Sequence, residues 1–181
     1  MLYDLTVPAY QNGLKALSAE LGRALAWGAE NDIGELQFAV ARLAPDMFPL
    51  AAQIRFTCTQ ALQPLVRLGV GDVPEFAEDA VDFADMQEQI AATLAFLDTV
   101  GPAALGDDAN RAVSFTLPNG MTFDMTALDY LRDWAQPQFY FHRVAAYAIL
   151  RHMGVPLGKA DYVSYMMRHL RPGTAPTAPA A

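Results

Sequence analysis

The sequence predicts an all-α protein with one small β-hairpin before its last long helix. Four long segments carry apolar residues three or four positions apart, which is the spacing of one face of an α-helix. Residues 112–125 instead alternate apolar and polar side chains, a pattern that indicates two strands. The chain has 181 residues, of which 53% are hydrophobic, and this is enough for a single helical domain, expected over residues 1–170.

The first helix is expected over residues 3–29, with Pro8 in its first turn, where a missing backbone N–H costs nothing. The turn residues 31–34 should end it. Its apolar stripe consists of Val7, Tyr10, Leu14, Leu17, Leu21 and Leu25. The charged side chains Lys15, Glu20 and Arg23 fall between these positions, so the helix is amphipathic.

A shorter helix is expected over residues 35–43, with Leu36, Ala39, Val40 and Leu43 on one side. Asp46 is then a suitable N-cap for a third helix over residues 47–68, because its carboxylate can accept unpaired backbone N–H groups. Pro64 predicts a kink or an early end of that helix.

The region after the third helix begins with a loop at residues 69–74. The acidic residues 75–85 are expected to form a solvated linker, with a partner-binding acidic patch as the alternative. They lead into a fourth helix over residues 83–100. Asn119-Gly120, between the two alternating runs, predicts a tight hairpin turn in which both residues have positive φ.

The last long helix is expected over residues 126–153, with Thr126 and Asp129 as a capping pair and Gly154 as its stop. A short helix over residues 161–170 should follow. The Pro/Ala-rich tail, residues 171–181, is expected to be disordered because it cannot bury enough apolar surface.

Chemistry is expected on the inward face of the last long helix, where His142 and Gln138 interrupt an otherwise apolar stripe. Pro137 either bends the helix beside them or begins a new helix. His142 has two interpretations. It is either a core histidine hydrogen-bonded by Gln138 or by another helix, or the polar anchor of a ligand pocket shared with Gln53 and Arg55 of the third helix.

Aromatic residues surround the same helix and predict core packing or a homodimer face. They are Trp134, Phe139, Tyr140, Phe141 and Tyr147, of which Trp134 is a further pocket candidate. Charged residues of this helix are expected to form ion pairs on its outer face; they are Asp129, Arg132, Asp133 and Arg143.

The three histidines give no standard metal site. His142 and His152 are ten positions apart, about 15 Å along a helix, so they cannot share an ion. The single cysteine, Cys58, lies on an apolar stripe and is expected to be an inert core thiol in a reducing compartment.

Bulk properties exclude several function classes. A formal net charge of −8 argues against nucleic-acid binding, which depends on Lys and Arg neutralising phosphates. No apolar run reaches the roughly 18 residues that a membrane helix needs. The N-terminus has an acid where a signal peptide carries positive charge, so we expect a cytoplasmic protein without membrane contact.

Two segments resemble a known family. Residues 138–158 (QFYFHRVAAYAILRHMGVPLG) resemble the last bundle helix of the DinB/YfiT-like superfamily of metalloenzymes, and residues 41–54 (ARLAPDMFPLAAQI) resemble an uncharacterised bacterial branch allied to it, a domain of unknown function. The similarity covers roughly residues 1–160, and residues 161–181 look like an addition. The resemblance implies a four-helix up-and-down bundle, often dimeric.

The superfamily's enzymes include thiol-dependent S-transferases and a maleylpyruvate isomerase. They hold a divalent metal with one histidine on the second bundle helix and two, four residues apart, on the last. Here Gln138 and His142 correspond to the last-helix pair, and residues 53–57, where the other ligand would fall, contain no histidine. The resemblance therefore implies a branch that has lost most of the metal histidines, and we expect neither metal nor cofactor.

Three functional hypotheses follow. The first is a metal-free bundle whose small polar pocket around His142, Gln138 and Gln53 binds a small molecule. The second is a degenerate metal-dependent thiol S-transferase or isomerase. The third is a structural homodimer without a ligand.

Overall fold

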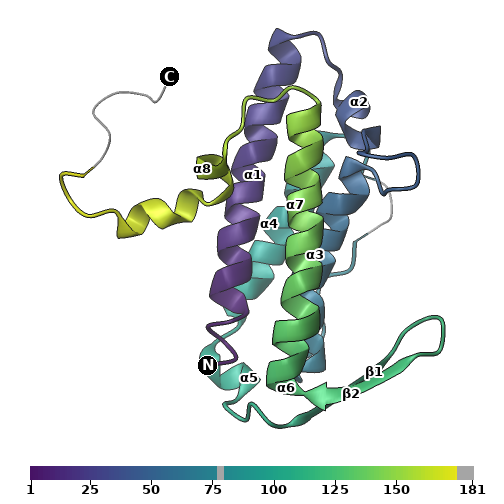
Figure 1. Cartoon of the computed structure of the whole chain (residues 1–181), viewed down its shortest axis with the longest axis vertical. Helices are drawn as coiled ribbons and strands as arrows, with labels where there is room; N and C mark the ends of the chain where they lie inside the picture. The colour runs from purple at the N-terminus through teal and green to yellow at the C-terminus, as the bar shows by residue number, and fades with distance from the viewer. Residues whose placement is uncertain (77–79, 175–181) are drawn as a thin grey trace.

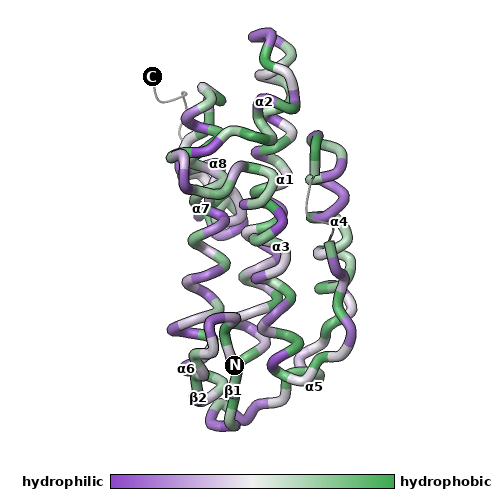
Figure 2. The backbone as a smooth tube through the Cα atoms, turned by 90° about the vertical axis from the view of Figure 1, so that its right-hand side faces the viewer, coloured by the Kyte–Doolittle hydropathy of each residue, from purple (hydrophilic) through white to green (hydrophobic). Residues whose placement is uncertain are grey.

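The computed structural model describes residues 1–76 and 80–174. Its four longest helices form a bundle, and they are α1 (Val7–Glu30), α3 (Leu50–Arg67), α4 (Phe83–Thr99) and α7 (Gln136–His152) (Figure 1). The predicted all-α fold class with one hairpin is confirmed. Apolar positions recur along each long helix (Figure 2), as expected where each helix buries one face. None of the described helices is both long and apolar enough to cross a membrane.

The four helices run up, down, down and up in chain order (Figure 1). Two contacts locate the ends of the parallel pair α3 and α4. The Phe83 N–H at the start of α4 donates to Oε2 of Glu35, which lies in the chain before α3, at 2.8 Å. The guanidinium of Arg111, which precedes the hairpin, donates to the Leu68 carbonyl just past the end of α3, at 2.7 Å. The chain after α3 must therefore return along the bundle before α4 begins.

The α1 helix begins at Val7, four residues later than expected, with Pro8 in its first turn as predicted. Its interior includes Gly13, where the Phe139 ring of α7 packs against the backbone; a Cβ built on Gly13 would lie 2.8 Å from the Phe139 ring. This close approach holds α1 and α7 together.

The second helix lies where it was predicted, but the side of the helix that is buried differs from the predicted side. α2 (Glu35–Val40) buries Phe38 and Ala39, whereas Leu36, Val40 and Leu43 are exposed. Phe38 packs edge-on against Phe83 of α4, with ring centroids 5.4 Å apart. A helix of six residues has too few turns for its own spacing to decide which face is buried.

The N-cap prediction for the third helix was wrong. Asp46 is exposed, and α3 begins only at Leu50, with Pro49 as its N-cap. Proline disfavours the helical region for the residue before it, so Phe48 lies outside the helix, which starts after Pro49. Pro64 does not end α3, which continues for three more residues to Arg67.

The linker prediction for residues 75–85 also needs correction. Ala80 is 7% exposed and Phe83 2% exposed, so apolar residues of this stretch belong to the core, while residues 77–79 lie outside the described part of the chain. Phe83 already belongs to α4, whose N-cap Asp82 accepts the Asp85 N–H at 2.9 Å.

The hairpin consists of β1 (Ala112–Thr116) and β2 (Thr122–Thr126), paired antiparallel, after a short helix α5 (Pro102–Leu105). Its turn differs from the expected one: Gly120 has φ +88°, but Asn119 does not have a positive φ. The Gly120 N–H donates to the Leu117 carbonyl at 2.8 Å, which indicates a three-residue loop closed by a left-handed glycine.

The last long helix is one continuous helix that consists of three consecutive segments, α6 (Ala127–Asp129), the π-helical segment η1 (Tyr130–Ala135) and α7. As predicted, Thr126 caps it, accepting the Asp129 N–H at 3.1 Å. The Gln136 N–H bonds five residues back to the Leu131 carbonyl. The π turn thus lies where Pro137 cannot donate, so the proline is accommodated without ending the helix.

The segment after α7 contains α8 (Lys159–Tyr162) and the 3₁₀ helix η2 (Ser164–His169), in place of the single helix expected over residues 161–170. Val163, with φ −112° and ψ 31°, separates them. The segment projects from the bundle beside α1 (Figure 1). The predicted disordered tail falls largely on residues 175–181, outside the described residues.

Candidate functional site

His142 of α7 and Gln53 of α3 lie together between the two helices. His142 Nδ1 and Gln53 Oε1 are 2.9 Å apart, and the two residues are 9% and 1% exposed. The Gln53 side-chain NH₂ donates to the Phe48 carbonyl at 3.2 Å, so its Oε1 faces the imidazole. An amide oxygen can only accept, so Nδ1 carries the proton and the lone pair is on Nε2.

Burial lowers the pKa of His142 to about 4. The imidazole is therefore neutral at neutral pH, because its charged form would lose hydration that no nearby acid replaces. A neutral ring with Nδ1 engaged offers one free function, the Nε2 lone pair, which can accept a hydrogen bond or act as a base.

Aromatic rings surround this imidazole. Phe56 and Phe141 have ring centroids 4.9 and 5.2 Å from it, and Phe48 packs on Phe56 at 4.9 Å. Phe48 and Phe141 are 56% and 58% exposed, so the cluster reaches the surface of the protein. We call Phe48, Phe56, Phe141 and His142 the aromatic face.

The other predicted site residues are arranged differently. Arg55 lies over the Phe56 ring at 4.4 Å, and its buried Nε has no hydrogen-bond partner among the described residues. Gln138 is half-buried and makes no side-chain hydrogen bond to His142 in the part of the chain described. Trp134 packs on the hairpin, against Phe115 at 5.0 Å and Phe123 at 5.5 Å. Because it precedes His142 by eight residues, it lies about 12 Å away along the helix.

The expectation that Arg143 lies on the outer face is wrong. Arg143 and Glu20 are each 1% exposed and form a two-pronged ion pair between α7 and α1, at 2.8 and 2.9 Å. Arg143 Nε also donates to the Gly13 carbonyl at 3.0 Å. Burial raises the pKa of the Glu20 carboxyl, and Arg143 opposes that shift. Of the predicted outer ion pairs, those of Arg132 with Asp129 and Asp133 are present and exposed.

Sequence reasoning missed this ion pair because a charged residue between apolar positions is usually solvated. The available signal was the place of Glu20 within α1, next to Leu21 and three residues after Leu17, both of which are fully buried. Cys58 is buried as predicted, and burial raises the pKa of its thiol to about 12, so it is not a reactive nucleophile.

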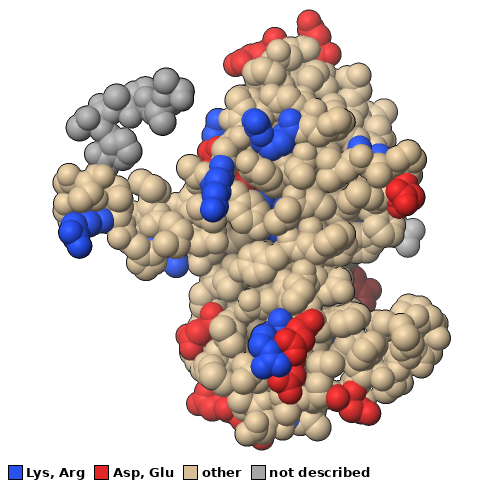
Figure 3. All heavy atoms as spheres, viewed as in Figure 1, with Lys and Arg blue, Asp and Glu red and all other residues tan. Residues whose placement is uncertain are grey.

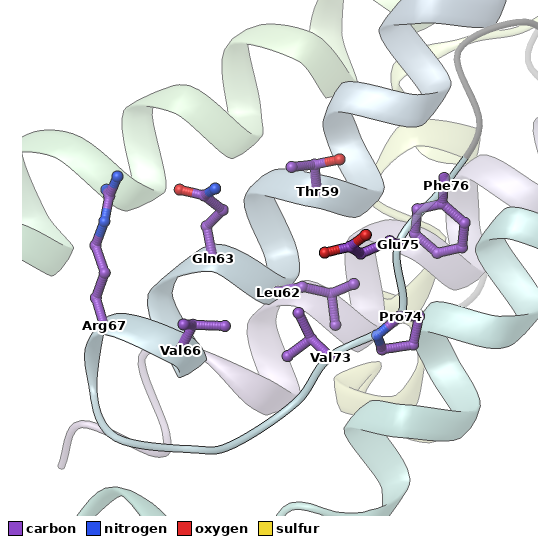
Figure 4. A pocket seen from close by; sticks show the side chains of 9 residues that line it. All are labelled: Thr59, Leu62, Gln63, Val66, Arg67, Val73, Pro74, Glu75 and Phe76. Atoms are coloured by element: carbon purple, nitrogen blue, oxygen red, sulfur yellow. The ribbon is translucent and has the colours of Figure 1, made fainter. Parts of the chain in front are cut away.

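A separate hollow of about 440 Å³ lies along α3 (Figure 4), and His142 is not one of the residues that line it. The residues that line it are Thr59, Leu62, Gln63, Val66, Arg67, Val73, Pro74, Glu75 and Phe76. Arg67 is held at one end by cation–π contact with Phe115 at 4.1 Å and donates to Tyr130 Oη at 3.1 Å. This hollow depends on the chain folding back after α3, which no local pattern in the sequence indicates.

The fold and the paired side chains of α3 and α7 define a DinB-like helical-bundle protein. The crystal structure of a DinB family member from Shewanella denitrificans is similar to this chain, with a TM-score of 0.84 and 30% sequence identity over 97% of this chain and 96% of that one. The model of the family DUF1993, a domain of unknown function, matches residues 2–163. The chain therefore belongs to the DUF1993 family. No curated protein matches it.

The metal that the DinB-like resemblance implies does not fit the residues present. His142 supplies one donor, Nε2, while the Gln53 oxygen is already bonded to the same imidazole. Nowhere in residues 1–76 and 80–174 do three His, Cys, Asp or Glu side chains gather closely enough to hold an ion. A catalytic zinc site needs three protein ligands, so we derive no chemical step through a metal.

Proposed function

We propose that this protein is a metal-free, small-molecule-binding member of its family, and that the ligand binds at the aromatic face through His142 Nε2. The observation that carries the proposal is the Nδ1···Oε1 contact of 2.9 Å to Gln53, which fixes the tautomer and leaves Nε2 as an oriented acceptor. A buried imidazole costs free energy unless its polar atoms are hydrogen-bonded, and Nε2 is the ring atom that a bound ligand would satisfy.

The chemistry of the face indicates the class of ligand. A neutral acceptor selects a molecule with an N–H or O–H donor. Phe48 and Phe141, both more than half exposed, offer ring surfaces to a planar apolar body. Phenol, indole and benzamide have this combination and serve as probes.

The test is ligand-observed NMR of these probes with wild type, His142→Ala and His152→Ala, the last altering an exposed histidine of the same helix. We expect saturable binding to wild type and His152→Ala, and affinity lower by about tenfold in His142→Ala, the loss of one hydrogen bond. Equal binding to His142→Ala, or no binding of any probe, would refute the proposal. A further variant, Gln63→Ala, reports binding in the hollow along α3 instead.

A second candidate function is homodimer formation across the same surface. Phe48, Phe141 and Val144 are 56%, 58% and 48% exposed, and aromatic residues are enriched at the centres of interfaces. Sedimentation equilibrium should then find wild type and Val66→Asp dimeric and Phe141→Asp monomeric. Val66 is the control because it is 47% exposed elsewhere, on the side of α3 that lines the hollow. A monomeric wild type would exclude this function.

Metal-dependent thiol transfer or isomerisation is the weaker alternative, since a metal ion would need further protein ligands beside His142. Elemental analysis of protein purified without a histidine tag should show no stoichiometric zinc, nickel or manganese. Treatment with EDTA should leave the melting temperature unchanged. One equivalent of metal that EDTA removes, with a fall in melting temperature, would favour the enzyme instead.

A further inference from the structure

A second hollow, of about 380 Å³, lies between α1 and the C-terminal segment. Its lining residues are Asn12, Lys15 and Ala16 of α1 with Ser164, Tyr165 and Arg168 of η2. Five of these six carry polar side chains, and none is acidic. The hollow shares no residue with the aromatic face, so it is independent of the function proposed above.

The segment that forms one wall is fastened to the bundle at two points before η2 begins. Arg23 of α1 pairs with Asp161 and donates to the Pro156 carbonyl at 2.6 Å. The Tyr162 ring lies against the Arg143 guanidinium, 4.2 Å from its central carbon. These contacts set the position of η2 relative to α1.

The charge of the hollow is unlike that of the rest of the protein. Lys15 and Arg168 have no ion-pair partner among the described residues, whereas Glu20 of α1 and Asp161 of α8 are already paired, with Arg143 and Arg23. The chain as a whole has a net charge of −8, yet residues 164–174 contain two arginines and no acid. Where this segment projects at the left of Figure 3, it shows basic atoms and no acidic ones.

Arg168 is held in place by contacts that leave part of its guanidinium free. Nη1 donates to Asn12 Oδ1 at 3.0 Å, and Nε donates to His169 Nε2 at 3.0 Å. Nη2 donates to no acceptor among the described residues, and Arg168 lines the hollow together with Lys15, Ser164 and Tyr165. Such a set consists of donors around two positive charges, which suits a doubly charged tetrahedral oxyanion.

We propose that this hollow is a binding site for a phosphate group, with Arg168 and Lys15 neutralising its charge and Ser164 and Tyr165 donating to its oxygens. The phosphate group can belong to a soluble phosphate compound or to a lipid headgroup. The chemistry at the site is the same for both.

The test uses the full chain and titrates inorganic phosphate and pyrophosphate by calorimetry at constant ionic strength. The variant is Lys15→Ala/Arg168→Ala. The matched control is Lys159→Ala/Arg171→Ala, which removes two cations of the same C-terminal segment that do not line the hollow. All four side chains lie at the surface, and circular dichroism verifies that each variant is folded. A parallel arm measures co-sedimentation with vesicles of phosphatidylcholine alone and with added phosphatidic acid.

We expect saturable binding of pyrophosphate or of phosphatidic acid vesicles by wild type and by the control pair. The lining pair should bind at least about tenfold more weakly, since it has lost the two positive charges that neutralise the phosphate. Binding in the soluble arm alone identifies a free phosphate compound, and binding in the vesicle arm alone identifies a headgroup. No saturable binding in either arm, or equal weakening in the control pair, would overturn the site.

Discussion

His142 differs from an ordinary histidine because it is buried among apolar side chains, and Gln53, to which its Nδ1–H donates, is uncharged. The closest groups on α3 and α7 are the rings of Phe56 and Phe141 and the Gln53 amide. Arg55 is stacked on Phe56 next to this cluster, and burial of the imidazole is the cause of its lowered pKa.

The pH dependence of stability should report this state. The folded protein takes up the imidazole proton only near pH 4, whereas an unperturbed histidine does so near pH 6.5. Between these values the unfolded chain binds more protons, so the free energy of unfolding falls as the pH falls. The stability advantage of wild type over His142→Asn, from urea unfolding, should therefore shrink between pH 7 and pH 4.

His152→Asn provides the comparison, since it alters an exposed histidine of the same helix. A constant difference for His142→Asn, or an NMR titration of His142 near pH 6.5, would contradict the assignment.

Two glycines of α1 should respond oppositely to the same substitution. Gly13→Ala places a Cβ 2.8 Å from the Phe139 ring, which is fully buried, so we expect a loss of about 1–3 kcal/mol from overpacking. Gly22→Ala meets nothing within 4 Å and should gain about 0.5–1 kcal/mol from helix propensity. Urea unfolding measures the change in the free energy of unfolding for both variants. If the two changes had the same sign, the α1–α7 contact would be looser than described.

At the scale of elements, the hairpin and the last helix are joined at Thr126, which ends β2 and caps the helix that follows. Its hydroxyl accepts the Asp129 N–H at 3.1 Å and contacts Asp129 Oδ2 at 2.7 Å. The same short stretch therefore fixes where the strand stops and where the first helical turn begins.

Removing this hydroxyl should destabilise the protein modestly. Thr126→Val leaves the shape of the side chain almost unchanged but eliminates the cap, with an expected cost of about 1 kcal/mol. Thr126→Ser keeps the oxygen and should remain close to wild type in chemical denaturation. If serine and valine were equally destabilising, the methyl contact rather than the cap would be responsible.

At the scale of the whole molecule, Arg143 connects three parts of the chain. It pairs with Glu20, donates to the Gly13 carbonyl of α1, and lies against Tyr162 of the C-terminal segment. Removing one partner of a buried ion pair is costly, because the remaining charge is then buried without water and without an opposite charge beside it.

Replacing only one residue of this pair should therefore lower the stability far more than replacing both with apolar residues. We expect Arg143→Met to lose about 3–5 kcal/mol, because Glu20 is left buried and unpaired. The double variant Arg143→Met/Glu20→Leu should recover much of that loss, and a double-mutant cycle from urea unfolding measures the coupling. Additive losses would mean that the two charges do not depend on each other.

The helices, the hairpin and the position of His142 could be predicted because they depend on local patterns. A period of 3.6 marks Leu14, Leu17 and Leu21, a period of two marks Val113 and Phe115, and both describe neighbours within one element. Predictions for short elements failed because their buried residues depend on distant contacts. In α2, Phe38 is buried by its contact with Phe83, and no local period indicates this.

By itself, the sequence determined the helical class, the hairpin, the cap at Thr126 and the inward position of His142 on the last long helix. Only the tertiary structure decided that Gln53 holds that histidine and that Arg143 is buried against Glu20, 123 residues away along the chain. It also decided that Lys15 faces Arg168 across a hollow. The physical reason is that the burial and pairing of a polar group depend on which distant segment packs against it, and spacing along one helix carries no information about that partner.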